Sequence, residues 1–294
     1  MKQIVFIVNP VAGGHSKERI LESIGQHMDA GRFTTRVIIS RKPGDIRSIC
    51  TDELKKGSDI LVAVGGDGTV NEVASAVSGK NAIMGVLPSG SGNGLARHLG
   101  IPLRMEKAMH CLNSGNIRTI DTGRINGRLF VNVAGVGFDG KMAKKFEAQS
   151  ERGFLGYLRS FISEYPKYKP KKYILEVNGR RTVTRALLIT FANSDQFGFN
   201  TSIAPSADIS DGLMDICIVQ KPSVIELPFI AGMLFWKRAD RLPHIETIRA
   251  ASARVYTPKN RYCNVDGEAV RLGNILDVRI IPQSLRMIVP SGED

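Results

Sequence analysis

A glycine-rich turn between two strongly patterned segments constrains this chain more than any other feature. The stretch Leu61 to Glu72, LVAVGGDGTVNE, begins as an apolar run typical of a buried strand and resumes after the glycines with helical apolar spacing. A strand, a glycine turn and a helix start favour a phosphate site, because glycines let the backbone approach a polyanion and a helix N-terminus presents N–H groups. Asp67 suits such a site only beside a metal ion or as a proton-handling group, and a tight turn with an aspartate cap is the alternative.

Two further turns repeat this arrangement. An apolar run over residues 3–8 leads into NPVAGG at 9–14 and an amphipathic segment over 16–28, and a short run over 84–87 leads into PSGSGNG at 88–94 before a helix near Leu95. Between them, residues 36–40 are expected to form a strand, and Asp45 can cap a helix to Lys56. Alternating strands and helices build a parallel sheet with ligands at the C-terminal strand ends. We therefore expect the first two turns to share one rim, and a nucleotide site rather than three structural turns.

The pattern changes near Thr122, beyond which the clearest segments are strands. The Asn178-Gly179 pair between alternating runs indicates a hairpin. We expect a second domain built as an antiparallel β-sandwich with three inserted helices. The expected strands cover 129–134, 172–177, 182–192, 213–219, 248–256 and 276–281, and the expected helices lie near 141–149, 155–165 and 223–237.

The charge is strongly positive, with 40 Lys and Arg against 28 Asp and Glu. Residues 152–185 hold nine of the cations and two of the acids, so part of the excess is local. Such a surface attracts anionic partners. Nucleic acid is disfavoured because no zinc finger or RRM-like motif accompanies the patch, whereas its interleaved aromatic residues suit a membrane interface; a solvated basic face is the alternative.

The remaining composition places the chain among intracellular globular proteins. The four cysteines are scattered with no ligand spacing, which indicates free buried thiols. The longest apolar run, residues 227–236, is about half of the roughly 20 residues that a membrane-spanning helix needs, and the N-terminus lacks a signal-peptide layout. We expect a cytoplasmic protein with no transmembrane segment.

Three acidic clusters interrupt the later strands. DISDGLMD at 208–215 resembles a cation loop, because hard cations favour carboxylate and backbone oxygens in a Gly-bent turn, although a surface Asp-Gly turn has the same spacing. VDGE at 265–268 can accept a hydroxyl proton or hold a magnesium ion, and an acidic hairpin turn would look the same. NVAGVGFDG at 132–140 places Asp139 and glycines at a strand end.

The motifs together resemble the diacylglycerol kinase catalytic family, which includes soluble bacterial lipid kinases and sphingosine kinases. NPxxGG, GGDGTVNE, PSGSGNGLAR, GVGFDG, DGLMD and DGE occur in order over almost the whole chain. The resemblance implies an ATP-dependent lipid kinase with its active site in a cleft between two domains. The implied fold is α/β plus β: a Rossmann-like, phosphofructokinase-like α/β domain over 1–122 and an antiparallel β-sandwich over 123–282, with the tail from about 283 to 294 packing back on the first domain.

Carried over position by position, the resemblance assigns a role to each motif. Glu268 matches the proposed proton acceptor, Asp67 the aspartate shared between nucleotide, metal and acceptor, and Asp266 accompanies them as a catalytic carboxylate. Which carboxylate is the base stays open. A magnesium loop would use Asp208, Asp211 and Leu213, the first and last through main-chain oxygens. The ATP-binding set would be Asn9, Pro10, Val11, Ala12, Gly13, Ser40, Gly66, Asp67, Gly68, Thr69, Val70, Asn71, Glu72 and Ser91.

Two departures from the bacterial diacylglycerol kinases leave the lipid acceptor open. Gly94-Leu95-Ala96 replaces the common Asp-Phe-Ala and is closer to sphingosine kinases, and the NSxxFGGG segment is reduced to a single glycine at Gly198. A sphingoid base therefore stands beside diacylglycerol as acceptor. The competing functions are a soluble-metabolite kinase of the NAD kinase type, which also uses a GGDGT turn, and a non-catalytic lipid- or nucleic-acid-binding protein.

The apolar segment from Val224 to Trp236 is followed by Lys237, Arg238 and Arg241. On apolarity alone an ordinary buried core helix is the favoured interpretation. The hypothesis that we keep beside it is a cover for acyl chains or a shallow membrane contact. This helix and the basic region before Arg185 would then attach the enzyme peripherally to an anionic bilayer. A homodimer is a further expectation.

Overall fold

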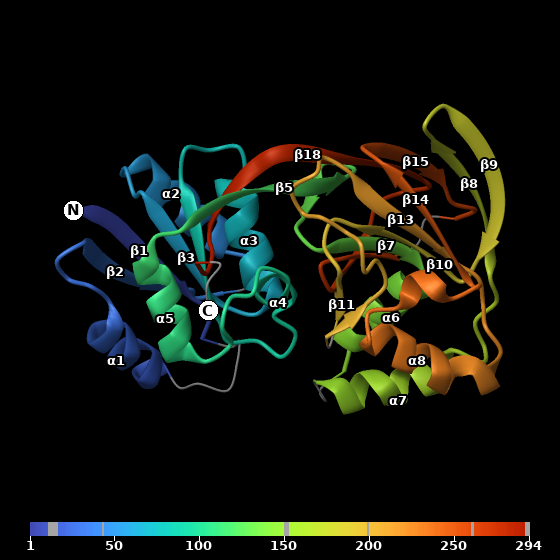
Figure 1. Ribbon diagram of the computed structural model, residues 1–294, viewed down its shortest axis with the longest axis horizontal. Helices are drawn as coiled ribbons and strands as arrows, with labels where there is room; N and C mark the ends of the chain where they lie inside the picture. Colours follow the sequence, from blue (N-terminus) through green and yellow to red (C-terminus); the bar gives the residue numbers. More distant parts are fainter. Residues whose placement is uncertain (11–16, 43, 150–152, 199, 260–261, 292–294) are drawn as a thin grey trace. The chain divides into compact units, whose positions relative to one another are not determined.

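A computed structural model describes residues 1–10, 17–42, 44–149, 153–198, 200–259 and 262–291 (Figure 1). The chain divides into two compact units, one formed by residues 1–120 and 283–294 and the other by residues 121–282. The fold class expected from the sequence is confirmed, because the first unit is α/β and the second is an antiparallel β-sandwich.

Unit 1 is built on a parallel sheet in the order β2-β1-β3-β4, with the last residues of β18 beside β4. Its strands are short runs of β-branched and other apolar residues, and β3 and β4 are buried along their whole length. Aliphatic side chains of these strands pack with α1 and α5 into one core. The strands are β1 (Lys2–Val8), β2 (Phe33–Ile39), β3 (Ile60–Gly65) and β4 (Ile83–Pro88), and the helices are α1 (Lys17–His27), α2 (Ile46–Lys55), α3 (Asp67–Val77), α4 (Gly94–His98) and α5 (Met105–Ser114).

Unit 2 contains two antiparallel sheets packed face to face. The first has the order β18-β15-β8-β9, with β5 and β6 beside β18, and the second has the order β14-β13-β10-β7-β16-β17. A short hairpin, β11 with β12, stands apart from both. The strands are β5 (Ile117–Ile125), β6 (Arg128–Phe130), β7 (Val133–Gly137), β8 (Lys171–Val177), β9 (Arg180–Ala186), β10 (Leu188–Ala192), β11 (Gln196–Gly198), β12 (Thr201–Ser202), β13 (Met214–Val219), β14 (Ile245–Ala250), β15 (Ser252–Tyr256), β16 (Tyr262–Val265), β17 (Glu268–Arg271) and β18 (Ile275–Ile288).

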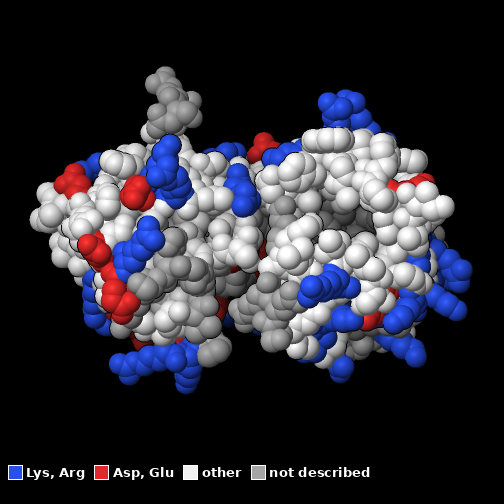
Figure 2. Space-filling view, turned by 90° about the horizontal axis from the view of Figure 1, so that it is seen from below, with Lys and Arg blue, Asp and Glu red and all other residues white. Residues whose placement is uncertain are grey.

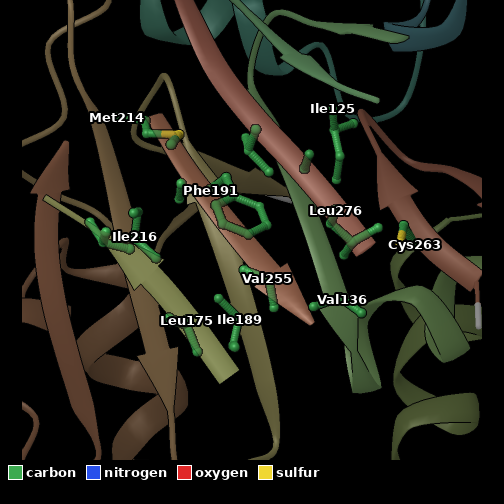
Figure 3. Packing of buried hydrophobic residues seen from close by; sticks show 14 of the residues in the cluster. Ile125, Val136, Leu175, Ile189, Phe191, Met214, Ile216, Val255, Cys263 and Leu276 are labelled. Carbon is green, nitrogen blue, oxygen red and sulfur yellow. The ribbon is translucent and has the colours of Figure 1, made fainter. Parts of the chain in front are cut away.

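The core of unit 2 lies between the two sheets. Leu175, Val255 and Leu276 from the first sheet meet Ile189 and Phe191 from the second, all within a few per cent of complete burial (Figure 3). The period of two along each strand directs alternate side chains of β10 and β13 to the opposite face of the second sheet. That face is covered by three helices, so the central strands β7, β10 and β13 are buried on both sides (Figure 1). The helices are α6 (Phe138–Glu147), α7 (Phe154–Glu164) and α8 (Leu227–Phe235), with single 3₁₀ turns at Val224–Glu226 and Ala239–Arg241.

Three of the expected strands are wrong in their extent. The run over 129–134 divides at residues 131–132 into β6 and β7. The run over 182–192 divides at Leu187 into β9 and β10, and the run over 248–256 divides at Ala251 into β14 and β15. In each case one half belongs to the first sheet and the other half to the second. A continuous β-branched run does not reveal where the chain crosses between two sheets, because both halves have the same composition. The Asn178-Gly179 hairpin is confirmed, with positive φ of 50° and 74° as its tight turn requires.

The expected buried core helix over 223–237 is also wrong. Helix α8 has no buried residue, and Phe229 and Trp236 are 65% and 69% exposed. Part of the helix still lines the apolar layer, through Leu227 and Leu234. Among the described residues, no helix is both long enough and apolar enough to cross a bilayer.

Candidate active site

The carboxyl ends of β1 and β3 lie side by side at the point where the strand order of the sheet of unit 1 reverses. Strand β1 has β2 on one side and β3 on the other, so the connections leave the sheet in opposite directions. The Asn9 side chain follows β1, and its Nδ2 donates a hydrogen bond of 3.1 Å to Oγ1 of Thr69 in α3. In open α/β sheets ligands bind at this switch point, beyond the carboxyl ends of the strands. Asn9 and the turn that precedes α3 therefore share one rim, as the strand–turn–helix pattern predicted, and residues 11–14 of the first turn lie outside the described residues.

The second and third glycine turns are in direct backbone contact. A Cβ added to Gly90 would lie 2.4 Å from Cα of Gly66, and one added to Gly66 would lie 3.2 Å from Cα of Gly90. The Ser89 N–H donates to the Gly65 carbonyl at 2.9 Å, which aligns the two turns. Because neither glycine can carry a side chain here, the rim presents backbone to whatever binds it. Such a surface fits a phosphate chain.

Asp67 joins these two turns through its carboxylate. Its oxygens accept hydrogen bonds from the N–H groups of Asn93, at 3.0 Å, and Gly94, at 2.7 Å. A Cβ on Gly92 would lie 2.4 Å from the same carboxylate, so the third turn closes tightly over it. Burial raises the pKa of Asp67, while the N–H groups of Gly94 and Asn93 oppose the rise. The Asp67 carboxylate thus accepts N–H groups at the start of α4, so it caps that helix, as the capping alternative expected of an aspartate in a tight turn. Each carboxylate oxygen keeps lone pairs that these bonds do not use, and these can contact a ligand.

The other residues assigned to ATP differ in exposure. Ser40 is buried at the end of β2, and its side chain hydrogen bonds with the Asp45 carboxylate. Thr69 and Val70 are buried, Gly66, Gly68, Asn71 and Glu72 are half-buried, and Pro10 and Ser91 are exposed. Val11, Ala12 and Gly13 lie outside the described residues.

In unit 2, the DGE motif forms a tight hairpin between β16 and β17. Asp266 and Gly267 have positive φ of 48° and 93°, and Val265 pairs with Glu268 across the turn. The buried Asp266 carboxylate accepts three backbone N–H groups, from Val131 at 2.7 Å, Asn132 at 2.9 Å and Val133 at 3.1 Å. Asp266 therefore fixes the chain between β6 and β7. Glu268 is exposed on the first position of β17.

A second buried carboxylate supports the same hairpin. Nδ2 of Asn264 donates to both carboxylate oxygens of Asp139, at 3.0 and 3.1 Å, and Oδ1 of Asn264 accepts the Gly267 N–H at 2.8 Å. A Cβ on Gly135 would lie 2.1 Å from the Asp139 carboxylate, so the glycines of GVGFDG make room for it. Burial raises the pKa of Asp139 to about 6, opposed by the Asn264 hydrogen bond.

Asp139 and Asn264 were not assigned as site residues from the sequence. The GVGFDG motif was a signal for Asp139, but its partner is 125 positions away. A pKa raised by burial next to a specific partner is typical of functional groups.

The loop assigned to magnesium is held by charged neighbours. The Asp211 carboxylate accepts the Leu213 N–H at 2.9 Å and forms an ion pair with Arg249, which also lies 3.3 Å from Asp215. Asp208 is exposed, and its carboxylate accepts the Ser210 N–H at 2.9 Å. In the part of the chain that the structure describes, no three His, Cys, Asp or Glu side chains converge as a metal-binding group. In this loop the Asp211 carboxylate is thus paired with Arg249, and the other oxygens on offer belong to the main chain. A cation can bind Asp211 only if the ion pair between Asp211 and Arg249 opens.

An apolar cavity of about 100 Å³ lies between the second sheet of unit 2 and its three helices. Asp139 is among the lining residues, and the other residues of the wall are mostly apolar. His244, on the opposite part of the wall, lies 3.5 Å from Glu226. The apolar lining comes from Phe138, Tyr157, Phe161, Tyr165, Leu187, Leu188, Phe197, Ile203, Val219, Pro222, Leu227, Ile230, Leu234, Leu242 and Ile245.

Comparisons with known proteins match both units. Residues 3–125 match the diacylglycerol kinase catalytic domain, and residues 132–289 match the YegS C-terminal NAD kinase beta sandwich-like domain. A diacylglycerol kinase of Bacillus subtilis is 27% identical over 91% of this chain and 90% of its own length, and a probable lipid kinase YegS-like of Pseudomonas aeruginosa is 30% identical over 94% and 91%. The crystal structure of a putative diacylglycerol kinase from Bacillus anthracis shares the fold, with a TM-score of 0.82 at 22% identity over 98% of this chain and 97% of that one.

Proposed function

The chain belongs to the family of bacterial diacylglycerol and lipid kinases, and on that premise we propose that it transfers the γ-phosphoryl group of ATP to a lipid hydroxyl. The acceptor in this proposal is a diacylglycerol or a sphingoid base. The observation that carries the lipid assignment is the apolar cavity of unit 2, because an NAD-type acceptor has no hydrocarbon to place there. The proposal assigns the nucleotide to residues 1–122 and the lipid to residues 123–282.

ATP fits the rim of unit 1 because the Gly66–Gly90 contact packs two glycine turns backbone to backbone next to the N-terminus of α3. In the proposal the phosphates lie against the turns at 9–13, 66–72 and Ser91, and α3 directs its N-terminal N–H groups toward them. The hydrogen bond between Asn9 and Thr69 joins the end of β1 to the start of α3 across the switch point. Bound ATP supplies the phosphoryl group, and a divalent cation neutralises the charge that develops during transfer.

The acceptor hydroxyl needs a base, and Glu268 is the residue that we propose for it. Glu268 is exposed and therefore accessible to substrate, whereas both oxygens of Asp266 are already engaged by backbone N–H groups. We therefore propose that Asp266 positions the hairpin that carries Glu268. Asp67 remains the second candidate for a direct role, through the lone pairs that its two backbone hydrogen bonds leave unused.

Magnesium is the expected cation, and Asp208, Asp211 and Leu213 are proposed as its ligands. Since Arg249 engages Asp211 in the described conformation, the loop fits a cation only after that ion pair opens. Substitution of Arg249 by Gln is expected to strengthen magnesium binding here, measured by calorimetry without nucleotide.

We propose that the enzyme works peripherally on the cytoplasmic surface of an anionic membrane, through α7 and α8. Several large apolar side chains on and beside these helices are exposed, and cations surround them; the right half of Figure 2 shows a broad uncharged area with basic clusters at its margin. Exposed apolar area of this extent, rimmed by cations, suits a bilayer surface. The exposed apolar residues are Phe154, Leu155, Leu158, Ile162, Val224, Ile225, Phe229, Phe235 and Trp236.

The function is tested by incubating the protein with γ-labelled ATP, magnesium and separate diacylglycerol, sphingoid-base, ceramide and NAD acceptors, followed by solvent partition. Label in the organic phase with one lipid supports the proposal, and label on NAD or on none of the acceptors refutes it. Membrane attachment is tested by flotation with anionic vesicles after reversal of Lys169, Lys171 and Lys172 to Glu. Unchanged flotation would remove the basic region from the proposal.

A further inference from the structure

A polar groove of about 620 Å³ lies on the first sheet of unit 2. Its floor is formed by residues of β5, β18, β15 and β8, on the side of the sheet that faces away from the core between the two sheets. Two hairpin turns, Asn126-Gly127 and Asn178-Gly179, contribute to its lining, with positive φ at all four residues. The groove shares no lining residue with the apolar cavity, so it is a separate candidate for a ligand site.

Two hydrogen bonds between main-chain groups show how β5 lies beside β18. The Asn126 N–H donates to the Asp277 carbonyl at 2.9 Å, and the Val289 N–H donates to the Asn116 carbonyl at 2.9 Å. Residue numbers rise along β5 while they fall along β18, so the two strands are antiparallel. The position two residues before Asn126 therefore lies beside the position two residues after Asp277.

These two positions hold Arg124 and Arg279. Both side chains point outward, because their neighbours Ile125 and Val278 lie in the core, and both residues line the groove. Like charges opposite each other on neighbouring strands destabilise a sheet. Among the described residues neither arginine forms an ion pair: Arg124 donates to the Gly127 carbonyl at 3.0 Å, and Arg279 is exposed. The fold therefore leaves two adjacent positive charges without a counter-charge of their own.

The same row continues with a hydroxyl group, and the next row carries carboxylates. The strand register places Ser252 opposite Arg279 and Arg254 opposite Asp277, and Glu176 follows in the second row. Asp277 forms an ion pair with Arg254 at 2.5 Å, so its charge is already balanced. Asp277 and Glu176 are still 58% and 35% exposed and can accept further hydrogen bonds. The groove thus presents a row of donors beside a row that contains acceptors.

We propose that this groove binds a polyol phosphate, a small polyhydroxylated molecule that carries a phosphomonoester. The phosphomonoester lies between Arg124 and Arg279, because planar guanidinium groups match phosphate oxygens two at a time, and Ser252 adds a hydroxyl donor. Its negative charge removes the repulsion between the two arginines. The hydroxyl groups of the polyol donate to the carboxylates of Asp277 and Glu176. The same headgroup chemistry reaches the groove either as a soluble metabolite or on a membrane lipid.

Other anions match the groove less well. A nucleotide needs a surface on which its base can stack, and none of the described residues that line the groove is aromatic. A nucleic acid strand carries a continuous row of phosphates, which Asp277 and Glu176 repel. Inorganic phosphate uses the donors alone. The inference does not depend on the lipid kinase proposal, because none of these residues belongs to the sites proposed for ATP, magnesium or lipid.

The test measures the binding of three probes to the full chain. Glycerol 3-phosphate and inorganic phosphate are titrated by calorimetry, and flotation compares phosphatidylcholine vesicles with and without phosphatidylglycerophosphate, which displays the same glycerol phosphate group. Arg124→Gln and Arg279→Gln are each expected to raise the dissociation constant for glycerol 3-phosphate at least about tenfold. Arg128→Gln removes an exposed arginine of β6 that lies outside the groove, and it should bind like the wild type.

The melting temperature separates a binding role from a structural one. Without ligand, Arg279→Gln should melt at or above the wild-type temperature, because the repulsion from Arg124 is gone. Glycerol 3-phosphate should then raise the melting temperature of the wild type more than that of the variant. A variant that melts below the wild type without ligand would assign Arg279 to structure and overturn the proposal.

The two sources of the ligand give different results. Binding of glycerol 3-phosphate from solution supports a soluble metabolite, and flotation that requires both phosphatidylglycerophosphate and Arg279 supports a lipid headgroup. Absence of binding to the vesicles and to glycerol 3-phosphate up to about 10 mM would overturn the proposal, as would equal binding by the wild type and both glutamine variants. Inorganic phosphate that binds as tightly as glycerol 3-phosphate would overturn the assignment of a polyol.

Discussion

Substitution of Asp139 by Asn is expected to stabilise the folded chain above neutral pH. The buried carboxyl has an ordinary pKa of 3.8 and a folded-state pKa of about 6, because burial penalises the charged form. Between these values the folded state binds more protons than the unfolded state, so stability falls as pH rises through this window. Above pH 7 the full penalty amounts to about 3 kcal/mol.

The neutral amide removes this penalty but keeps one hydrogen bond to Asn264. A lost hydrogen bond costs about 1 kcal/mol, so the net gain for Asp139→Asn should be about 2 kcal/mol at pH 7.5 and near zero or negative at pH 4. Urea unfolding at several pH values measures the free energy of unfolding of the variant and of the wild type. The contributions of the other titrating groups cancel in the difference between the two. Asp52→Asn, on an exposed carboxyl of α2, is the matched control for the removal of one negative charge.

A stability difference that stays constant between pH 4 and 7.5 would refute the assignment of a raised pKa to Asp139. Activity provides the second measurement. If the carboxyl lining the apolar cavity contacts the acceptor, turnover of the variant falls although its fold is more stable. Such opposite changes are the usual signature of a group that is kept for function at a cost in stability.

Three further changes separate positioning from catalysis. Asp266→Ala leaves three buried backbone N–H groups without their acceptor and should lower the free energy of unfolding by about 3 to 5 kcal/mol in urea titrations; a loss below 1 kcal/mol would contradict the role of this carboxylate. Glu268→Gln, on an exposed position, should lower turnover at least about a hundredfold with the melting temperature unchanged, and near-normal turnover would remove Glu268 from the mechanism. Gly90→Ala must separate this turn from Gly66, so it should abolish the rise in melting temperature that ATP gives the wild type, whereas Gly79→Ala, on a surface turn, should keep that rise.

The parts predicted from sequence are those specified by neighbouring residues. The glycine turns of unit 1 follow β-branched runs and precede helical spacing, so the strand–turn–helix order and the shared rim could be deduced from local chemistry. The Asn178-Gly179 hairpin was predicted for the same reason. The family motifs then supplied the fold of both units.

The parts that could not be predicted depend on distant contacts. Asp139 meets Asn264, and Asp211 meets Arg249, across 125 and 38 positions. Nothing in the local sequence of α8 distinguishes a core helix from one that covers a cavity and exposes its aromatic residues, because both are uniformly apolar. The division of strands at Leu187 was missed because the change of sheet is decided by packing on both sides of the second sheet.

The strand β18 gives the chain an unusual order of assembly. Its last residues pair with β4, and the following segment hydrogen bonds with Asn116, so the segment after residue 282 returns to the unit formed by residues 1–120. During synthesis, residues 1–120 emerge before β18, which pairs with β4. One edge of β4 therefore stays unpaired until residues 121–282 have been synthesised. The start of β4 at Ile83 and Met84 therefore gains its second neighbouring strand only after residues 121–282 have been synthesised, so the sheet of unit 1 cannot be completed before unit 2 has been made.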